Sequence, residues 1–248
     1  MENSYGANAM DLGIAGSGAE PEKKPAAFYV IDGTADPGRQ AREIPGGKIG
    51  YRIVKRVFDI VASLVGMILL LPIFLLVALA IKIEDRGPVF FVQERNGING
   101  KVFRMYKFRS MCTDAEKMHQ SLLDQNELDG PAFKMKNDPR LTKVGKVLRR
   151  TSIDELPQLL NILKGEMSVV GPRPLPTYET EQCNAYQRQR MLVKPGLTCY
   201  WQCSGRNDIP FDEWVELDLK YIREAGILTD LRIILRTVGS VIGGRGAY

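Results

Sequence analysis

Two neighbouring acids, Asp154 and Glu155, stand shortly after Arg149 in the sequence, and a Gly-Pro-Arg-Pro segment follows them at 171–174. Arginine side chains neutralise and orient phosphate oxygens through a fixed fork of donors. A carboxylate can attack phosphorus, and a second carboxylate beside it can hold a divalent cation. The pattern therefore favours chemistry on a phosphate group.

The same acids also fit a structural role. Ser152 and Glu155 have the spacing of a capping box, in which the serine caps a helix and the glutamate bonds back to the amide of the cap. Pro157 disfavours helical angles at the residue before it, so a helix is expected to begin or restart there. Asp154 then lies at a helix N-terminus, where free amides attract phosphate oxygens. Spacing alone leaves capping and catalysis both open.

Further cations could complete a phosphate site if the fold gathers them around Asp154. Arg173 stands between two prolines, which would preset its guanidinium, although a surface turn explains the same residues. Lys107 falls near the end of an expected strand, and Lys194 and Arg206 lie in glycine-containing turns. Each of these residues is a weak signal when taken singly.

An uncharged apolar run of 22 residues, Ile60 to Ile81, precedes these motifs. As a helix of about 1.5 Å per residue, it would just cross a hydrocarbon layer of roughly 30 Å. Pro72 lies inside the run, and basic residues flank both of its ends, each of which prefers the cytoplasmic side. We therefore expect a re-entrant helix-break-helix hairpin; the alternative is a kinked single-pass helix.

Three regions are predicted along the chain. Residues 1–46 read as a flexible tail, residues 47–84 as the membrane anchor, and residues 85–248 as one compact cytoplasmic catalytic domain. The domain is expected to be α/β and mainly helical. A chain of 248 residues with 44% hydrophobic content can bury one substantial core.

Several elements of this domain can be predicted. Strand patterns at 89–93 and 102–108 flank two Asn-Gly pairs and predict a hairpin. Asp138-Pro139 predicts the N-cap of a basic amphipathic helix, which could lie at the bilayer surface or pack on the core. Two C-terminal helices are expected, at 212–224 and from 229 onwards. The apolar stripe of the second is expected in the core, and it includes Leu228, Leu231, Leu235 and Val238.

Composition narrows the function. The formal net charge of +5 suits nucleic acid, an anionic membrane or an anionic small substrate. His119 is the only histidine, which argues against a histidine base, and the sequence has no P-loop, HExxH or Asp-x-Asp motif. The four cysteines match no compact disulfide framework and no cleavable signal peptide opens the chain, so we expect a reducing, cytoplasmic setting.

Taken in order, the motifs resemble those of the bacterial sugar transferases, the monotopic phosphoglycosyl transferases. The resemblance runs from about Lys55 to Tyr248. The matching segments are Lys55-Arg56-x-x-Asp59, Tyr-Lys-Phe-Arg-Ser-Met at 106–111, Ser-Ile-Asp-Glu-Leu-Pro-Gln-Leu at 152–159, Gly-Pro-Arg-Pro at 171–174, Lys-Pro-Gly-Leu-Thr at 194–198 and Ser-Gly-Arg-Asn at 204–207.

The resemblance implies transfer of a sugar 1-phosphate from a UDP-sugar to undecaprenyl phosphate, giving undecaprenyl-diphosphate sugar and UMP, the first membrane step of polysaccharide assembly. It implies that Asp154 is the nucleophile that forms a covalent phosphosugar and that Glu155 binds Mg²⁺. Lys107 and Arg149 would support the site electrostatically. The implied substrate contacts are Arg173, Arg206 and Lys194.

The expected location is the bacterial inner membrane, with the active site facing the cytoplasm. The expected partners are the UDP-sugar, undecaprenyl phosphate and membrane lipid, without nucleic acid; a homo-oligomer and other glycan-assembly enzymes are compatible with this reading. Two other functions stay open, a non-catalytic membrane scaffold and a magnesium-dependent phosphohydrolase. The sequence does not indicate which sugar is transferred.

Overall fold

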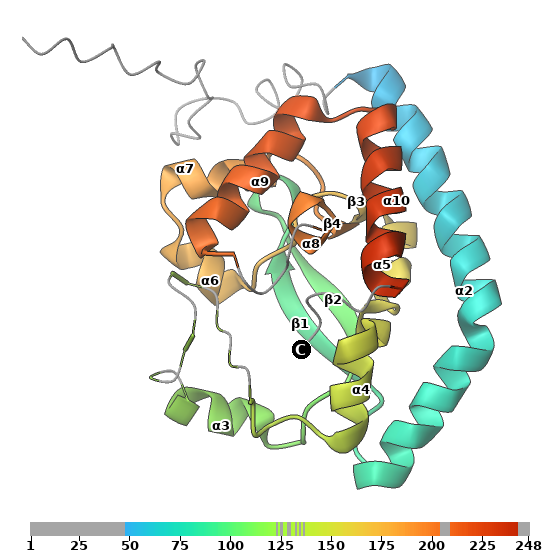
Figure 1. The fold of residues 1–248 in the computed structure, drawn as a ribbon, viewed down its shortest axis with the longest axis vertical. Helices are drawn as coiled ribbons and strands as arrows, with labels where there is room; N and C mark the ends of the chain where they lie inside the picture. The colour runs from blue at the N-terminus through green and yellow to red at the C-terminus, as the bar shows by residue number, and fades with distance from the viewer. Residues whose placement is uncertain are drawn as a thin grey trace, which may run out of the picture.

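The computed structural model describes residues 48–242 except 123, 125, 128–129, 132, 134, 136 and 204–208, so the expected tail lies outside the described residues. The predicted mainly helical α/β fold is confirmed, with two small sheets. Figure 1 shows the long helix α2 along one side of the other elements. The elements in chain order are α2 (Ile49–Asp85), β1 (Phe90–Asn96), η2 (Ile98–Gly100), β2 (Val102–Phe108), α3 (Ala115–Leu122), α4 (Lys143–Thr151), η4 (Ile153–Glu155), α5 (Gln158–Lys164), β3 (Ser168–Val170), α6 (Thr177–Gln182), α7 (Ala185–Arg188), η5 (Gln189–Leu192), β4 (Gly196–Thr198), α8 (Tyr200–Cys203), α9 (Phe211–Glu224) and α10 (Ile227–Ile242).

α2 is one uninterrupted helix of 37 residues with Pro72 inside it, so the predicted break in the helix is wrong. A proline removes one backbone donor and crowds the preceding turn, but the turns on either side keep their own hydrogen bonds. A long helix can therefore bend at a proline without ending, and Figure 1 shows α2 curving along its length. By length and composition, α2 is sufficient to cross a membrane.

The first turns of α2 are tied to the domain by polar contacts. Lys55 Nζ lies 2.7 Å from Oδ2 of Asp230 in α10. The Arg56 guanidinium donates to two carbonyls at the C-terminal end of α5, at 2.6 and 2.7 Å, where a helix leaves acceptors unpaired. Asp59 is buried and accepts a 3.0 Å hydrogen bond from the hydroxyl of Ser168 in β3. The Lys-Arg-x-x-Asp motif therefore docks this end of α2.

The last turn of α2 is attached to the same domain. Glu84 accepts a 2.7 Å hydrogen bond from the backbone amide of Lys143 and so caps α4 from a distant part of the chain. Asp85 accepts two hydrogen bonds from the guanidinium of Arg109, directly after β2. Both ends of the apolar helix are thus fixed to one folded unit.

The predicted hairpin is confirmed. β1 and β2 pair antiparallel, with Phe90 opposite Phe108 and Asn96 opposite Val102. Asn99 in the connecting turn has a φ of 54°, a left-handed conformation that asparagine adopts more readily than most residues. The hairpin carries Lys107 one residue before its end.

α4 begins later than the sequence predicts. Thr142 is its N-cap, with the side-chain oxygen accepting from the amide of Gly145 at 2.9 Å. The predicted cap, Asp138, is buried and accepts instead from the guanidinium of Arg140 at 2.8 and 2.7 Å. The N-cap prediction is wrong because this carboxylate is already engaged by the arginine. Leu148 is buried, so one face of α4 packs on the core.

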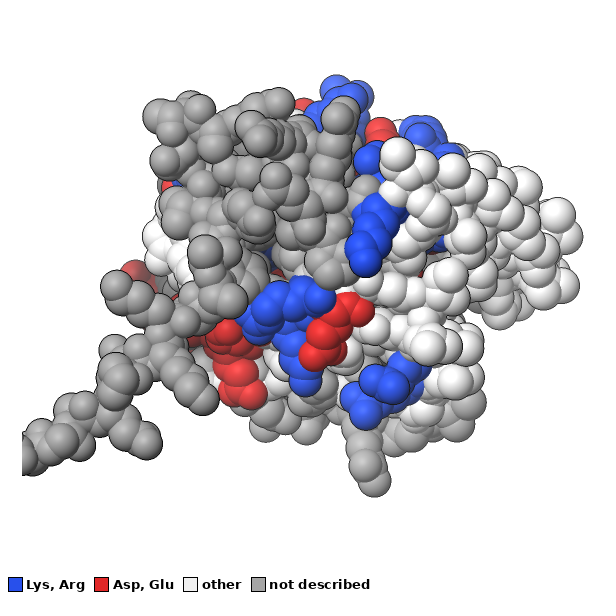
Figure 2. Space-filling model, turned by 90° about the horizontal axis from the view of Figure 1, so that it is seen from above, with Lys and Arg blue, Asp and Glu red and all other residues white. Residues whose placement is uncertain are grey.

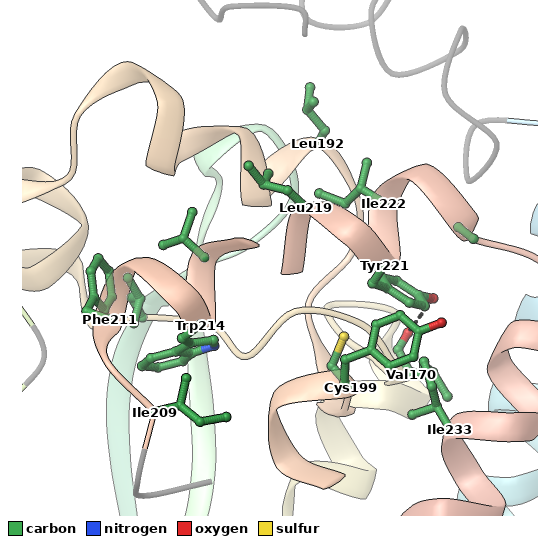
Figure 3. Close-up of a cluster of buried hydrophobic side chains, with 14 of the residues drawn as sticks. Val170, Leu192, Cys199, Ile209, Phe211, Trp214, Leu219, Tyr221, Ile222 and Ile233 are labelled. Atoms are coloured by element: carbon green, nitrogen blue, oxygen red, sulfur yellow. Dashed lines mark hydrogen bonds between the residues drawn. The ribbon is translucent and has the colours of Figure 1, made fainter. Parts of the chain in front are cut away.

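The largest buried cluster lies among β3 and the C-terminal helices α8, α9 and α10. α9 follows its prediction, and Trp214, Leu219 and Tyr221 point into this cluster (Figure 3). The Tyr221 hydroxyl donates to the carbonyl of Val170 in β3 at 3.3 Å, the dashed contact in Figure 3. The small parallel sheet and α9 are therefore joined through one core.

The apolar stripe of α10 faces outward. Its residues Leu228, Leu231, Leu235 and Val238 are between 52 and 77% exposed, so the prediction that they lie in the core is wrong. Only the opposite face, with the buried Ile233, meets the domain. Figure 2 shows a broad uncharged surface on the side where α2 lies, with Lys and Arg side chains along its border.

Candidate active site

The acid pair lies in a tight turn between α4 and α5. α4 ends at Thr151, its C-cap Ser152 turns the chain with a φ of 57°, and the single 3-10 turn η4 carries Asp154 and Glu155. The side chain of Ser152 does not cap this turn, so the capping-box geometry is not formed. Asp154 is buried. α5 begins at Gln158, directly after Pro157, as the sequence predicts.

Two cations converge on one oxygen of Glu155. Lys107 Nζ, from β2, lies 3.1 Å from Oε1, and Arg173 Nη2 donates to the same atom at 2.6 Å. Arg173 belongs to the loop that follows β3. Three segments that are far apart in the sequence therefore meet at this carboxylate.

The loop that carries Arg173 is fixed against β4 by close backbone contact. The amide of Gly171 donates to the carbonyl of Thr198 at 2.8 Å, and the amide of Gly196 donates to the carbonyl of Pro172 at 2.9 Å. A Cβ atom on Gly196 would lie 2.1 Å from the Gly171 nitrogen. Only glycine permits this approach, which explains why the two motifs at 171–174 and 194–198 both contain one.

The two acids have opposite pKa shifts. Burial raises the pKa of Asp154 to about 6, and the charge of Glu155 adds to this effect. Burial would also raise the pKa of Glu155, but the charges and hydrogen bonds of Arg173 and Lys107 outweigh it and hold that pKa well below its usual range. Glu155 is thus a permanent anion, while Asp154 is the more basic carboxylate and the better nucleophile.

Arg149 completes the group around the acids. Its Nε donates to the hydroxyl of Ser110 at 3.1 Å, and its positive charge lowers the pKa of Asp154. The structure therefore brings Lys107, Arg149 and Arg173 together around the acid pair, as the phosphate hypothesis requires.

The sequence of the chain is similar to those of known proteins. The family model described as bacterial sugar transferase matches residues 50–244. The chain belongs to this family. The Galactosyl transferase CpsE of Streptococcus agalactiae serotype III is 48% identical over 203 residues, which cover 81% of this chain and 44% of that protein. The undecaprenyl-phosphate galactose phosphotransferase of Salmonella typhimurium is 42% identical over 206 residues, or 81% of this chain and 43% of that protein.

A shorter relative is matched over most of its length. The exopolysaccharide production protein ExoY of Rhizobium meliloti is 41% identical over 200 residues, which are 79% of this chain and 88% of that protein. The chain thus spans less than half the length of the two longer relatives, 44 and 43%, and most of the shorter one.

Of the two other substrate contacts expected of a bacterial sugar transferase, Lys194 is not part of this group. Lys194 lies beside α2. Burial and the positive charge of Arg56 lower its pKa, and the nearby carboxylate of Asp59 partly opposes this shift. Its assignment as a substrate contact stays a prediction that the arrangement does not favour. Arg206 lies outside the described residues.

Arg95 supports the site of this bacterial sugar transferase without having been predicted to. Its Nη1 donates to the carbonyl of Pro174 at 3.0 Å, next to Arg173. Burial and the charge of Arg173 lower the pKa of Arg95 to about 10. Its position in the hairpin gave no signal in the sequence, because only the fold brings β1 to the 171–174 loop.

Asn161 is a second unpredicted residue. It is fully buried in α5, and its side-chain amide donates to the carbonyl of Arg104 at 2.7 Å and accepts from the amide of Tyr106 at 3.0 Å. The side chain thus pairs with backbone groups of β2 as a neighbouring strand would. This contact fixes the position of Lys107 relative to the acid pair. A buried amide in an apolar helix is a signal that could have been noticed, because such groups are nearly always hydrogen-bonded.

The acid pair fits a magnesium ion that keeps most of its water. Within the described residues, no three acids, histidines or cysteines gather into a metal cage. Mg²⁺ does not need one, because it usually takes one or two carboxylates together with substrate phosphates. Lys107 and Arg173 both bond Oε1 of Glu155, and among the described residues Oε2 receives no hydrogen bond. Within this part of the chain, that oxygen is the one available to a cation.

Proposed function

We propose that this bacterial sugar transferase moves a sugar 1-phosphate from a UDP-sugar to undecaprenyl phosphate, forming undecaprenyl-diphosphate sugar and UMP. The observation that carries this proposal is the buried, basic Asp154 beside a Glu155 that two cations neutralise. The relative from Salmonella typhimurium, named for an undecaprenyl-phosphate galactose transfer, supports the choice of acceptor.

The transfer would proceed in two displacements. A carboxylate oxygen of Asp154 bonds to the phosphorus that bears the sugar, the bond between that phosphorus and the bridging oxygen breaks, and UMP departs with the electron pair. An oxygen of undecaprenyl phosphate then bonds to the same phosphorus, and the carboxylate of Asp154 leaves. A covalent phosphosugar on the enzyme lets a polar nucleotide and a lipid use the site in turn.

The cations around the acids provide the electrostatic part of catalysis. A phosphoryl transfer places charge on the oxygens of the transferred group, and fixed positive groups lower the barrier by stabilising that charge. Arg149 and Arg173 have planar guanidinium groups suited to phosphate oxygens. Mg²⁺ bound at Glu155 would supply further neutralisation of the diphosphate.

The attachment of α2 supports a membrane topology in which the helix does not cross the bilayer. A straight helix of 37 residues would measure about 55 Å, well over the roughly 30 Å of a hydrocarbon layer. Lys55 and Asp85 nevertheless bond the same folded domain. A folded domain rich in Lys and Arg stays on one side of the bilayer. Both ends of α2 therefore belong on that side, the cytoplasmic face of the inner membrane. The outward apolar stripe of α10 would meet the same membrane surface.

A rapid-quench experiment tests the proposed reaction. Purified protein in lipid nanodiscs is mixed with Mg²⁺ and a UDP-sugar labelled in its β-phosphate, without the lipid acceptor. We expect one labelled adduct at Asp154 with stoichiometric UMP, no adduct for Asp154→Asn, and a normal adduct for Asp114→Asn, which alters an exposed aspartate. Adduct formation by Asp154→Asn at the wild-type rate would contradict the nucleophile, and continued turnover of the UDP-sugar to UMP and free sugar 1-phosphate without acceptor would indicate a phosphohydrolase.

A further inference from the structure

Arg173 is held at both ends by residues outside the acid pair. Its backbone carbonyl accepts a 3.0 Å hydrogen bond from Nη2 of Arg190, in the 3-10 turn η5. Its guanidinium carbon lies 5.7 Å from the centre of the Trp201 ring, a separation at which a cation is attracted to an aromatic face. The side chain and the backbone of the same residue are therefore both restrained.

These two restraints are joined through a pair of tryptophans. Trp201 of α8 stacks on Trp214 of α9, with ring centres 4.4 Å apart and planes 19° from parallel. The guanidinium carbon of Arg190 lies 4.7 Å from the centre of the Trp214 ring. The contacts close a circuit that runs from the guanidinium of Arg173 through two rings and Arg190 to the backbone of Arg173.

Asp218 fixes the far side of this circuit. It is fully buried, Arg190 is 5% exposed, and the two side chains form an ion pair. A buried guanidinium without a carboxylate partner would be strongly unfavourable, so Asp218 holds Arg190 in place. The same nitrogen, Nη2, that pairs with Asp218 also donates to Arg173. The packing of α9 thus reaches the loop at 171–174.

We infer that Trp201, Trp214 and Arg190 are positioning residues that hold the Arg173 guanidinium ready to bind the diphosphate of the substrate, an inference that rests on the proposed function. An arginine side chain has many rotamers, and ordering it on binding costs affinity. A ring face restricts the guanidinium to one plane, and the clamped carbonyl fixes where the side chain starts. This arrangement lets Arg173 exchange Glu155 for a phosphate without searching for its position.

A double-mutant cycle tests the inference with UDP as the diphosphate probe. The affinity for UDP and the kcat and KM for UDP-sugar are measured for the wild type, Trp201→Ala, Trp201→Phe, Arg173→Lys and the double variant Trp201→Ala with Arg173→Lys. We expect Trp201→Ala to weaken UDP binding about fivefold to tenfold and to raise the KM by a similar factor, with a smaller change in kcat. Trp201→Phe, which keeps an aromatic face, should recover most of this loss.

The decisive comparison is between the effect of Trp201→Ala in the wild type and its effect in Arg173→Lys. In Arg173→Lys, which lacks the planar group that the ring restrains, the added Trp201→Ala should change UDP affinity less than about twofold. Phe211→Leu is the matched control, because Phe211 touches the edge of Trp214 with ring centres 5.6 Å apart, whereas the guanidinium groups of Arg173 and Arg190 lie over the Trp201 and Trp214 rings. It should lower the melting temperature and leave UDP affinity unchanged.

The inference is overturned if Trp201→Ala weakens UDP binding equally in both backgrounds, or if Phe211→Leu weakens it as much. Those results would mean that the tryptophans act only through stability. The failure of the proposed function looks different, since the wild type would then bind UDP and show the cycle but release no UMP from any UDP-sugar.

Discussion

Asp154 and Glu155 are neighbours in the chain, yet among the described residues the cations of the site bond only Glu155. Lys107 and Arg173 both donate to its Oε1, at 3.1 and 2.6 Å, while Asp154 is buried in the turn beside them. The surroundings thereby move the two pKa values in opposite directions. Two carboxylates separated in this way can take two different roles in one reaction.

The first prediction concerns pH. A nucleophilic Asp154 must be ionised, and its pKa is raised to about 6, so kcat/KM should fall about tenfold per unit as the pH drops below 6. Burial lowers the pKa of Lys107 to about 8, so its charge, and its pairing with Glu155, are lost as the pH rises through that value. UMP release measured from pH 5 to 9.5 should give a bell-shaped profile, and a flat profile between pH 5 and 7 would contradict it.

A second prediction follows from the charge of Lys107. That charge lowers the pKa of Asp154, so Lys107→Met should raise this pKa and move the acidic limb of the profile to higher pH. Activity at pH 6.5 should therefore fall more than activity at pH 8. Lys117→Met is the control, since Lys117 in α3 is 85% exposed and its ion pair is with the exposed Asp114, just before that helix. An equal loss at every pH would show that Lys107 does not act on the nucleophile.

Gly145 is predicted to be irreplaceable. A Cβ atom there would lie 1.8 Å from the carbonyl oxygen of Ser110, which belongs to the backbone and cannot move aside easily. Gly145→Ala should destabilise the protein by about 2 kcal/mol or more and reduce UMP release, because α4 carries Arg149. Gly50→Ala is the matched change, with nothing within 4 Å, and should be neutral or stabilising by up to about 1 kcal/mol. Thermal unfolding in detergent measures both, and equal melting temperatures would refute the clash.

The topology of α2 can be tested by labelling. Lys48→Cys and Arg86→Cys flank the helix and are placed one at a time in a background whose four native cysteines are alanine. Because both helix ends bond one domain, neither cysteine should react with a membrane-impermeant maleimide in intact spheroplasts, and both should react after lysis. Labelling of one of them from outside would mean that α2 crosses the membrane.

Several features follow from the sequence alone because they depend on neighbouring residues. The apolar run at 60–81 predicts helical structure, two Asn-Gly pairs between strand patterns predict the hairpin, and the apolar spacing after Asp212 predicts α9. The acid pair could also be found from the sequence, since residue types and motif order mark it, and its chemistry stays a proposal. The arrangement of the cations around the pair could not be read from the sequence, because Lys107, Arg149 and Arg173 come from separate elements.

Tertiary structure decided the points where local rules allow more than one outcome. A proline permits either a break or a bend in a helix. α2 is continuous through Pro72, and contacts with the domain hold it at both ends. An apolar stripe fits a core or a membrane equally well. In α10 the face around Ile233 packs on the core, and the stripe with Leu228 is exposed. Lys194 and Arg173 looked alike as cations in turns, but only the pairing of β3 with β4 brings Arg173 to Glu155. Long-range packing selects among such alternatives because its free energy depends on partners that are distant in the chain.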